Sequence, residues 1–241
     1  HRESIVVIDF GSQYSRLIAR RVRESNVYCE LVSNDADWNT VAPLNPKGVI
    51  LSGGPASVYD SGAPLAPSWV YDRRVPVLGI CYGMQVLVHQ LGGKVLAGEK
   101  REYGHAVLHQ NASGSPLFHG LDQALPVWMS HGDRVVKIPR AFEVLASSED
   151  CPFAAVRHRR DPIWGVQFHP EVHHTERGSQ ILDRFLRYAQ VRHDWTPGFM
   201  MTEAIERIRT QVGDSEVISA VSGGVDSTVA TALVHRAVGD R

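Results

Sequence analysis

The sequence has few cysteines, no long apolar run and no excess of either charge. Its three cysteines are scattered and odd in number, which argues against a disulfide framework and favours a reducing, cytoplasmic location. The 26 acidic and 25 basic residues nearly cancel, so nothing indicates a surface for nucleic acid. The first apolar run, Ile5 to Ile8, is too short for a signal peptide or a membrane span. We therefore expect a globular protein with neither a nucleic-acid nor a membrane partner.

Short apolar runs alternate with helical patterns in the first 91 residues. Strands are expected at Ile5–Asp9, Val27–Val32, Gly48–Leu51 and Val75–Ile80. One helix, capped by Ser12, is expected after the strand Ile5–Asp9, and another at Tyr82–Leu91. Such alternation predicts an α/β fold with an open, mostly parallel sheet and helices on both faces.

The middle of the chain has short apolar runs without helical spacing, which predicts a mixed edge region built from hairpins. These runs are Ala106–His109, Val127–Met129, Arg134–Ile138, Phe142–Ala146, Phe153–Val156 and Ile163–Phe168. A helix from about Glu176 to Ala189 is expected to close a first domain at residues 1–191.

The chain after the first domain reads as a linker and the beginning of a second domain. Residues 192–200 have linker character, and residues 201–241 predict a helix with Ile205 and Ile208 on one face. A strand at Val217–Val221, a glycine turn and a helix from Ser227 towards Val238 would follow. One such β-turn-α unit cannot cover both faces of its strand, so we expect residues 201–241 to be an incomplete domain.

The segment Gly79-Ile80-Cys81-Tyr82-Gly83 has the form G-x-C-x-G between a predicted strand and a helix. It is the thiol counterpart of the nucleophile elbow, a tight turn that lifts the nucleophile out of the sheet edge. The N-terminus of the helix favours a thiolate at Cys81. A buried structural cysteine fits the same residues, so this turn alone leaves both interpretations open.

The segment Gln167-Phe168-His169-Pro170-Glu171 follows a short apolar run. A cysteine nucleophile needs a base, and the base needs an orienting acceptor. Residues two apart in an extended segment project to the same side, so His169 suits the base and Glu171 the orienting group. A surface turn is the alternative. His173 and His174 raise the possibility of a metal site, but no cysteine or carboxylate stands at an established ligand spacing, so we expect no metal.

The turn Ser52-Gly53-Gly54-Pro55 ends another predicted strand. Sites in open α/β sheets form beyond the carboxyl ends of the strands. The backbone N–H groups of Gly53 and Gly54 could face a developing oxyanion together with the N–H of Tyr82. A plain Gly-Pro turn is again the alternative.

In this order and spacing, the three motifs together resemble the class I glutamine amidotransferases over roughly residues 4–190. The resemblance implies that Cys81 attacks the side-chain amide of glutamine through a thioester, that His169 transfers protons and that Glu171 orients it. It also implies oxyanion donors at Gly54 and Tyr82 and glutamine contacts at Gly53, Gln85, Ser130, His131 and Asp133. This step would need no cofactor.

A second glycine turn, Ser222-Gly223-Gly224-Val225-Asp226-Ser227, precedes the last predicted helix. Backbone N–H groups of such a turn can form an anion site, although the lysine of a Walker A loop is missing and a plain serine-glycine turn fits too. The segment resembles the pyrophosphate loop of the N-type ATP pyrophosphatases, in the adenine-nucleotide α-hydrolase-like fold. That resemblance implies ATP contacts at Ser222, Gly223, Gly224, Val225, Asp226, Ser227 and Thr228.

The pairing of these motifs resembles the GMP synthetase family, as do Asp9–Tyr14 and Trp128–Asp133. In that family ammonia aminates xanthosine monophosphate (XMP), which is activated by ATP with magnesium, and the full-length enzyme is a homodimer. The resemblance places the XMP site and the dimerisation region beyond Arg241. We therefore expect this chain to hold the glutaminase and only the pyrophosphate loop of the synthetase.

Two other functions remain open. A stand-alone cysteine hydrolase acting on γ-glutamyl peptides would have no use for the ATP loop. A non-catalytic module that binds glutamine would have no need of the complete set Cys81, His169 and Glu171.

Overall fold

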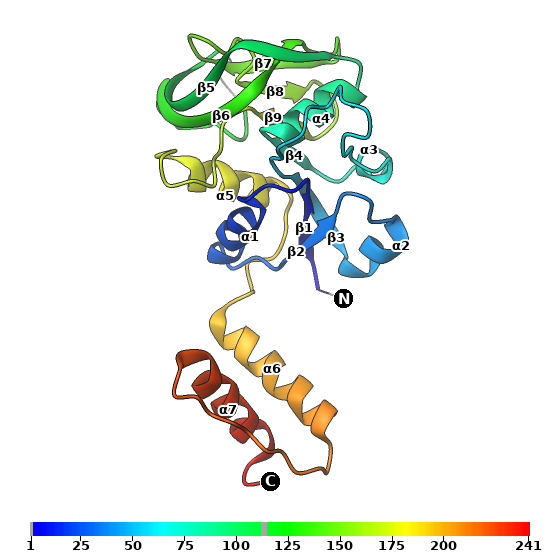
Figure 1. Cartoon of the computed structure of the whole chain (residues 1–241), viewed down its shortest axis with the longest axis vertical. Coiled ribbons are helices and arrows are strands. Elements are labelled where there is room, and N and C mark those ends of the chain that lie inside the picture. Colours follow the sequence, from blue (N-terminus) through cyan, green and yellow to red (C-terminus); the bar gives the residue numbers. More distant parts are fainter. Residues whose placement is uncertain (1, 112–114) are drawn as a thin grey trace. The chain divides into compact units, whose positions relative to one another are not determined.

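The computed structural model describes residues 2–111 and 115–241. The chain divides into two units, His1–Arg192 and His193–Arg241 (Figure 1). His1 and residues 112–114, which fall inside the first predicted domain, lie outside the described part. Within the described ranges, none of the helices combines the length and the apolar character needed to cross a membrane.

The first unit is built around a nine-stranded mixed sheet of the described residues, in the order β2-β1-β3-β4-β9-β8-β7-β5-β6. The strands are β1 (Ser4–Asp9), β2 (Cys29–Ser33), β3 (Pro46–Leu51), β4 (Val77–Ile80), β5 (Lys94–Gln110), β6 (Ala124–Lys137), β7 (Phe142–Ser147), β8 (Ala155–His158) and β9 (Ile163–Val166). The pairs among β2, β1, β3, β4 and β9 are parallel, and those from β9 through β8, β7 and β5 to β6 are antiparallel. The predicted α/β fold with a mixed edge region is confirmed.

Helices cover both faces of the parallel part. They are α1 (Ser15–Glu24), α2 (Trp38–Val41), the 3-10 turn η1 (Ala42–Leu44), α3 (Trp69–Asp72), α4 (Tyr82–Gln90) and α5 (Gly178–Tyr188). Alternate residues of β1 enter different cores: Ile5 and Val7 join the core under α1 and α5, whereas Val6 and Ile8 join the core under α3 and α4. Because both faces are buried, this strand reads as a continuous apolar run.

The order of the parallel strands brings the sequence motifs to one edge. The register aligns Ile8 with Leu51, Leu51 with Gly79, and Ile80 with Val166. The segments that follow β1, β3, β4 and β9 therefore leave the sheet side by side at its carboxyl edge. Functional sites of open parallel sheets lie at this edge.

Several predicted boundaries in the edge region were wrong. The runs at Val127–Met129 and Arg134–Ile138 belong to one strand, β6, and the run at Ala106–His109 is the end of the longer β5. These two strands form a long antiparallel ribbon with register shifts. The first half of β5 was missed because it pairs only with β6 and few of its described side chains are buried, so it shows no clear apolar alternation.

Ser12 does not cap the first helix. Helix α1 begins at Ser15 with Tyr14 as its N-cap residue, and no side chain caps it. The hydroxyl of Ser12 instead accepts a hydrogen bond from the N–H of Tyr14 at 3.0 Å. Serine commonly closes such a local turn, and the turn competes with capping for the same hydroxyl.

The second unit contains two helices, α6 (Pro197–Val212) and α7 (Val225–Val238), that contact each other. The predicted strand at Val217–Val221 is wrong, because these residues have no regular secondary structure. Ile218 is 99% exposed. A strand needs a neighbour for its backbone hydrogen bonds, and no described strand pairs with this segment. Helix α7 also begins two residues before the predicted Ser227.

Candidate active site

Cys81 occupies a strained turn between β4 and α4. Its φ of 53° and ψ of −108° are uncommon for a residue with a side chain. The strain is held by close packing of the two flanking glycines. A Cβ on Gly79 would lie 2.6 Å from Leu87 Cδ1, and a Cβ on Gly83 would lie 2.3 Å from the carbonyl oxygen of Leu51. The sheet and α4 therefore fix the position of the Cys81 sulfur, as in a nucleophile elbow.

His169 and Glu171 form a buried pair beyond the end of β9. Nδ1 of His169 lies 2.7 Å from Oε1 of Glu171, and the two residues are 3% and 0% exposed. Because the carboxylate can only accept at this nitrogen, Nε2 is left for the thiol of Cys81. The predicted base and its predicted orienting group thus lie in hydrogen-bond contact.

Three hydrogen bonds hold the His169 segment against β6. The N–H of His169 donates to the carbonyl of Trp128 at 3.0 Å. The hydroxyl of Thr175 donates to the carbonyl of His169 at 2.6 Å and accepts from the N–H of Trp128 at 3.1 Å. Thr175 is buried and was not predicted from the sequence. No local pattern signals it, because its partners are 6 and 47 residues away along the chain.

Electrostatics at His169 favour the charged imidazole. Burial by itself lowers the pKa of His169, but the carboxylate of Glu171 and the hydrogen bond and charge of Cys81 raise it to about 11. A cationic imidazole beside Cys81 stabilises a thiolate. Burial raises the pKa of Cys29 to about 11 and that of Cys151 to about 12.

The glycine turn after β3 packs against the same group. A Cβ on Gly54 would meet the carbonyl oxygen of Phe10 at 2.8 Å and Tyr82 Cδ1 at 3.1 Å. A Cβ on Gly53 would lie 3.3 Å from Cε1 of His169. A Cβ at Gly54 would clash with the backbone of Phe10, so glycine is needed for this close approach to the start of α4.

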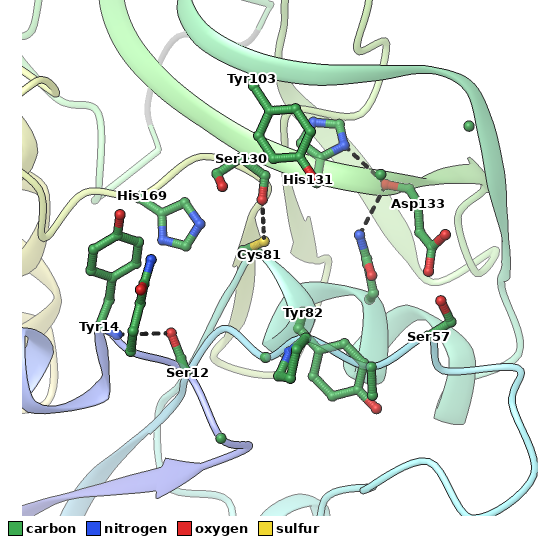
Figure 2. A pocket seen from close by; sticks show the side chains of 18 of the residues that line it. Ser12, Tyr14, Ser57, Cys81, Tyr82, Tyr103, Ser130, His131, Asp133 and His169 are labelled. Atoms are coloured by element: carbon green, nitrogen blue, oxygen red, sulfur yellow. Dashed lines mark hydrogen bonds between the residues drawn. The ribbon is translucent and has the colours of Figure 1, made fainter.

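A cavity of about 740 Å³ opens above these residues. Its lining includes the predicted residues Cys81, His169, Gly54, Tyr82, Gln85, Ser130, His131 and Asp133. Figure 2 shows Cys81 below Ser130, with the His169 ring beside it. Gly53 and Glu171 do not line the cavity: Gly53 lies against the His169 ring, and Glu171 lies behind it.

Three tyrosines of the cavity were not among the predicted site residues: Tyr14 ends the segment Asp9–Tyr14, Tyr59 lies in a loop, and Tyr103 lies on β5. Tyr14 packs edge-on against the His169 ring, with centroids 5.4 Å apart. The hydroxyl of Tyr59 donates to Oδ1 of Asp133 at 2.8 Å. Tyr103 also lines the cavity and is 63% exposed. The site is therefore bordered by aromatic side chains as well as by the predicted polar ones.

Among the described residues, one group has the ligand types of a metal site: Glu102, His131 and Cys151, with ligand atoms within 4.8 Å of one another. Nε2 of His131 lies 3.1 Å from Oε2 of Glu102, and its Nδ1–H donates to the carbonyl of Asp133 at 2.9 Å. Both ring nitrogens of His131 thus lie close to oxygen atoms, and the buried thiol of Cys151 completes the group.

In the second unit, the glycine turn lies at the N-terminus of α7. Gly223 has a φ of +81°, and the hydroxyls of Ser222 and Ser227 are 3.1 Å apart. The hydroxyl of Thr228 donates to the carbonyl of Gly224 at 2.8 Å. The turn is almost wholly exposed. Its geometry is that of a helix N-terminus with hydroxyls close by, a common arrangement for binding phosphate.

The chain belongs to the class I glutamine amidotransferase family, whose model matches residues 6–189. It is 56% identical over 241 residues, 100% of this chain and 45% of the relative, to a GMP synthase [glutamine-hydrolyzing] of Dehalococcoides mccartyi (strain ATCC BAA-2266 / KCTC 15142 / 195). It is also 54% identical to the GMP synthase [glutamine-hydrolyzing] of Thermomicrobium roseum. That match covers 99% of this chain and 45% of the relative.

A solved structure of a Thermoplasma acidophilum protein, described as one of the subunits of a GMP synthase, has a TM-score of 0.71 and 31% identity. The match covers 79% of this chain and 95% of that one. The chain thus spans less than half the length of the curated relatives that it matches.

Proposed function

We propose that this chain is the glutaminase part of a GMP synthetase. The observation that carries the proposal is the meeting of Cys81, held at a φ of 53°, with the buried His169–Glu171 pair at one cavity. The names and identities of the relatives favour GMP synthesis over other uses of the released ammonia.

The arrangement supports hydrolysis of the glutamine side-chain amide in two steps. The Cys81 thiolate adds to the amide carbon, and the backbone N–H groups of Gly54 and Tyr82 stabilise the oxyanion. His169 donates a proton to the leaving nitrogen, which departs as ammonia and leaves a thioester on Cys81. His169 then takes a proton from water as the water attacks the thioester, and glutamate leaves. Glu171 keeps the imidazole in the orientation that both transfers need.

The far end of the cavity suits the amino-acid end of glutamine. Gln85, Ser130, His131 and Asp133 line it, and Asp133 supplies a carboxylate opposite in charge to an α-ammonium group. Tyr59 donates to that carboxylate in this structure. Glutamine binding would replace or share this hydrogen bond.

The second unit supports a synthetase role at the pyrophosphate loop. ATP would be held at residues Ser222 to Thr228, where backbone N–H groups and hydroxyls gather at the start of α7, and magnesium would accompany it. ATP would supply the activation of XMP. In the complete enzyme, a cytoplasmic homodimer, ammonia from Cys81 would then replace the activated oxygen of XMP. The free state of all three cysteines fits a reducing compartment.

Glutamate release from glutamine tests the glutaminase. We expect release by the parent chain and by Cys29→Ala, a control in the core, and none by Cys81→Ala. Equal release by the parent and Cys81→Ala would contradict the assigned nucleophile. If no variant releases glutamate, labelling with a glutamine-like chloroketone decides: the parent is labelled at Cys81 if the site is competent, and absence of labelling overturns the proposal.

A chimera tests GMP synthesis. The chain joined to the remaining part of the Dehalococcoides relative should form GMP from XMP, magnesium ATP and glutamine. The same chimera with Cys81→Ala should form GMP from ammonium but not from glutamine. Failure with both nitrogen donors, in a chimera that folds, would contradict the proposed synthetase pairing.

A further inference from the structure

Gln167 contacts the nucleophile from below the cavity. It is the second residue before His169, it is 1% exposed and it does not line the cavity. Its Nε2 donates to the sulfur of Cys81 at 3.7 Å. The mechanism proposed for Cys81, His169 and Glu171 does not use this buried amide.

Two hydrogen-bond contacts of the Cys81 sulfur respond differently when the thiol loses its proton. The thiol donates to the carbonyl of Ser130 at 3.5 Å, and this contact is lost when the proton leaves, because a carbonyl only accepts. The N–H of Gln167 remains a donor in both states and is stronger towards an anion. It therefore favours the thiolate and fixes where the sulfur lies.

The orientation of the Gln167 amide is set by a chain of hydrogen bonds. Nε2 of Gln85 donates to the backbone carbonyl of Asp133 at 3.1 Å and to Oε1 of Gln167 at 3.3 Å. Because the Asp133 carbonyl can only accept, it fixes the nitrogen of Gln85 on that side. A reversed Gln167 amide would place two donors together and aim an oxygen at the sulfur, so the network selects the orientation with N–H towards Cys81.

We propose that Gln167 is a positioning residue of the glutaminase that holds the Cys81 sulfur as a thiolate, and that Gln85 relays the state of the glutamine pocket to it. The two ends of the relay are the substrate-facing Gln85, which lines the cavity, and the nucleophile. Glutamine that engages Gln85 would thereby change the hydrogen bonding of Gln167 and the readiness of the sulfur. The inference rests on the proposed role of Cys81 as nucleophile.

The pH dependence of Cys81 alkylation by iodoacetamide tests this without glutamine. Mass spectrometry of the Cys81 peptide reads this residue alone, and the other two thiols react slowly, because burial raises the pKa of Cys29 to about 11 and of Cys151 to about 12. Gln167→Met keeps the size but removes the donor, and Gln167→Glu replaces the donor by an oxygen. Gln180→Met, at an exposed position of α5, is the matched control.

In Gln167→Met, the midpoint of the alkylation profile should move to higher pH by about one unit, so the alkylation rate at a pH below the midpoint should be about tenfold lower. In Gln167→Glu the midpoint should move further in the same direction. Gln85→Met should give a smaller shift in the same direction, because the Gln167 amide is then free to reverse. Gln180→Met should match the parent. Identical profiles in the parent, Gln167→Met and Gln167→Glu, with unchanged thermal melting, would overturn the proposal.

The rate of glutamate release gives a second readout. It should fall with a raised pH optimum in Gln167→Met, a change that general loss of packing would not produce. If Cys81→Ala still releases glutamate, the proposed function fails, whereas the alkylation profiles still decide whether Gln167 acts on the sulfur. The two failures are therefore distinguishable.

Discussion

The carboxylate of Glu171 lies 2.7 Å from Nδ1 of His169 at a position where neither residue is more than 3% exposed. Only two positions separate them in the chain, so Pro170 and the end of β9 set the spacing. The other carboxylate oxygen, Oε2, has no hydrogen-bond partner among the described residues. The interaction with the imidazole is therefore the principal compensation for burying this carboxylate.

Glu171→Gln should abolish most of the glutaminase activity. The amide keeps the shape of the side chain but removes the charge that raises the pKa of His169 and can present its NH₂ group to Nδ1. We expect kcat for glutamate release to fall by about 10³- to 10⁴-fold, as for comparable triads. Glu149→Gln, at an exposed position, is the control. Activity near that of the parent would remove Glu171 from the mechanism.

The His169 charge should make stability depend on pH. Its folded pKa, about 11, lies above the ordinary value of 6.5, so the stabilisation is fully present below pH 6.5 and is lost as pH rises towards 11. Each pKa unit corresponds to about 1.4 kcal/mol. The free energy of unfolding in urea should therefore differ more between the parent and His169→Gln at pH 6 than at pH 10. A difference that stays constant or grows with pH would contradict the sign.

Gly83→Ala should destabilise the first unit. A Cβ there would lie 2.3 Å from the Leu51 carbonyl oxygen, so β3 and α4 would have to separate. The free energy of unfolding should fall by about 3 kcal/mol, at the upper end for overpacking. Gly198→Ala is the control, because its Cβ would meet nothing closer than the Thr196 hydroxyl at 4.0 Å. Equal melting temperatures for the two variants would show that the turn adapts.

Thr175→Val should loosen the histidine segment. It removes the hydroxyl that joins the His169 carbonyl to the Trp128 N–H, and the buried His169 carbonyl and the partly buried Trp128 N–H both lose that partner. We expect a loss of about 1–3 kcal/mol in stability. The rate of glutamate release should fall about tenfold or more, because small displacements of a catalytic group are costly. Thr175→Ser keeps the hydroxyl and should restore most of both. If Thr175→Ser loses as much stability and activity as Thr175→Val, the cause is lost packing of the side chain and not the missing hydroxyl.

Parts of this site could be predicted because each is local. The turn around Cys81, the pair His169 and Glu171, and the glycines at 53 and 54 are short motifs whose chemistry follows from residue type and spacing. The contacts of Gln167 and Thr175 could not be predicted. Their partners lie on β6 and at the end of β4, and they meet only when the mixed sheet is complete.

The sequence by itself determined the alternation of strands and helices, the tight turn at Cys81 and the close spacing of His169 and Glu171, because periodicity and steric demands act within a few residues. Tertiary structure decided which strands are neighbours, and hence that β9 lies beside β4 and carries His169 to Cys81. It also decided the length of β5 and left Val217–Val221 without strand structure. Strand pairing is a long-range choice: a segment becomes a strand only where another supplies the hydrogen bonds for its backbone.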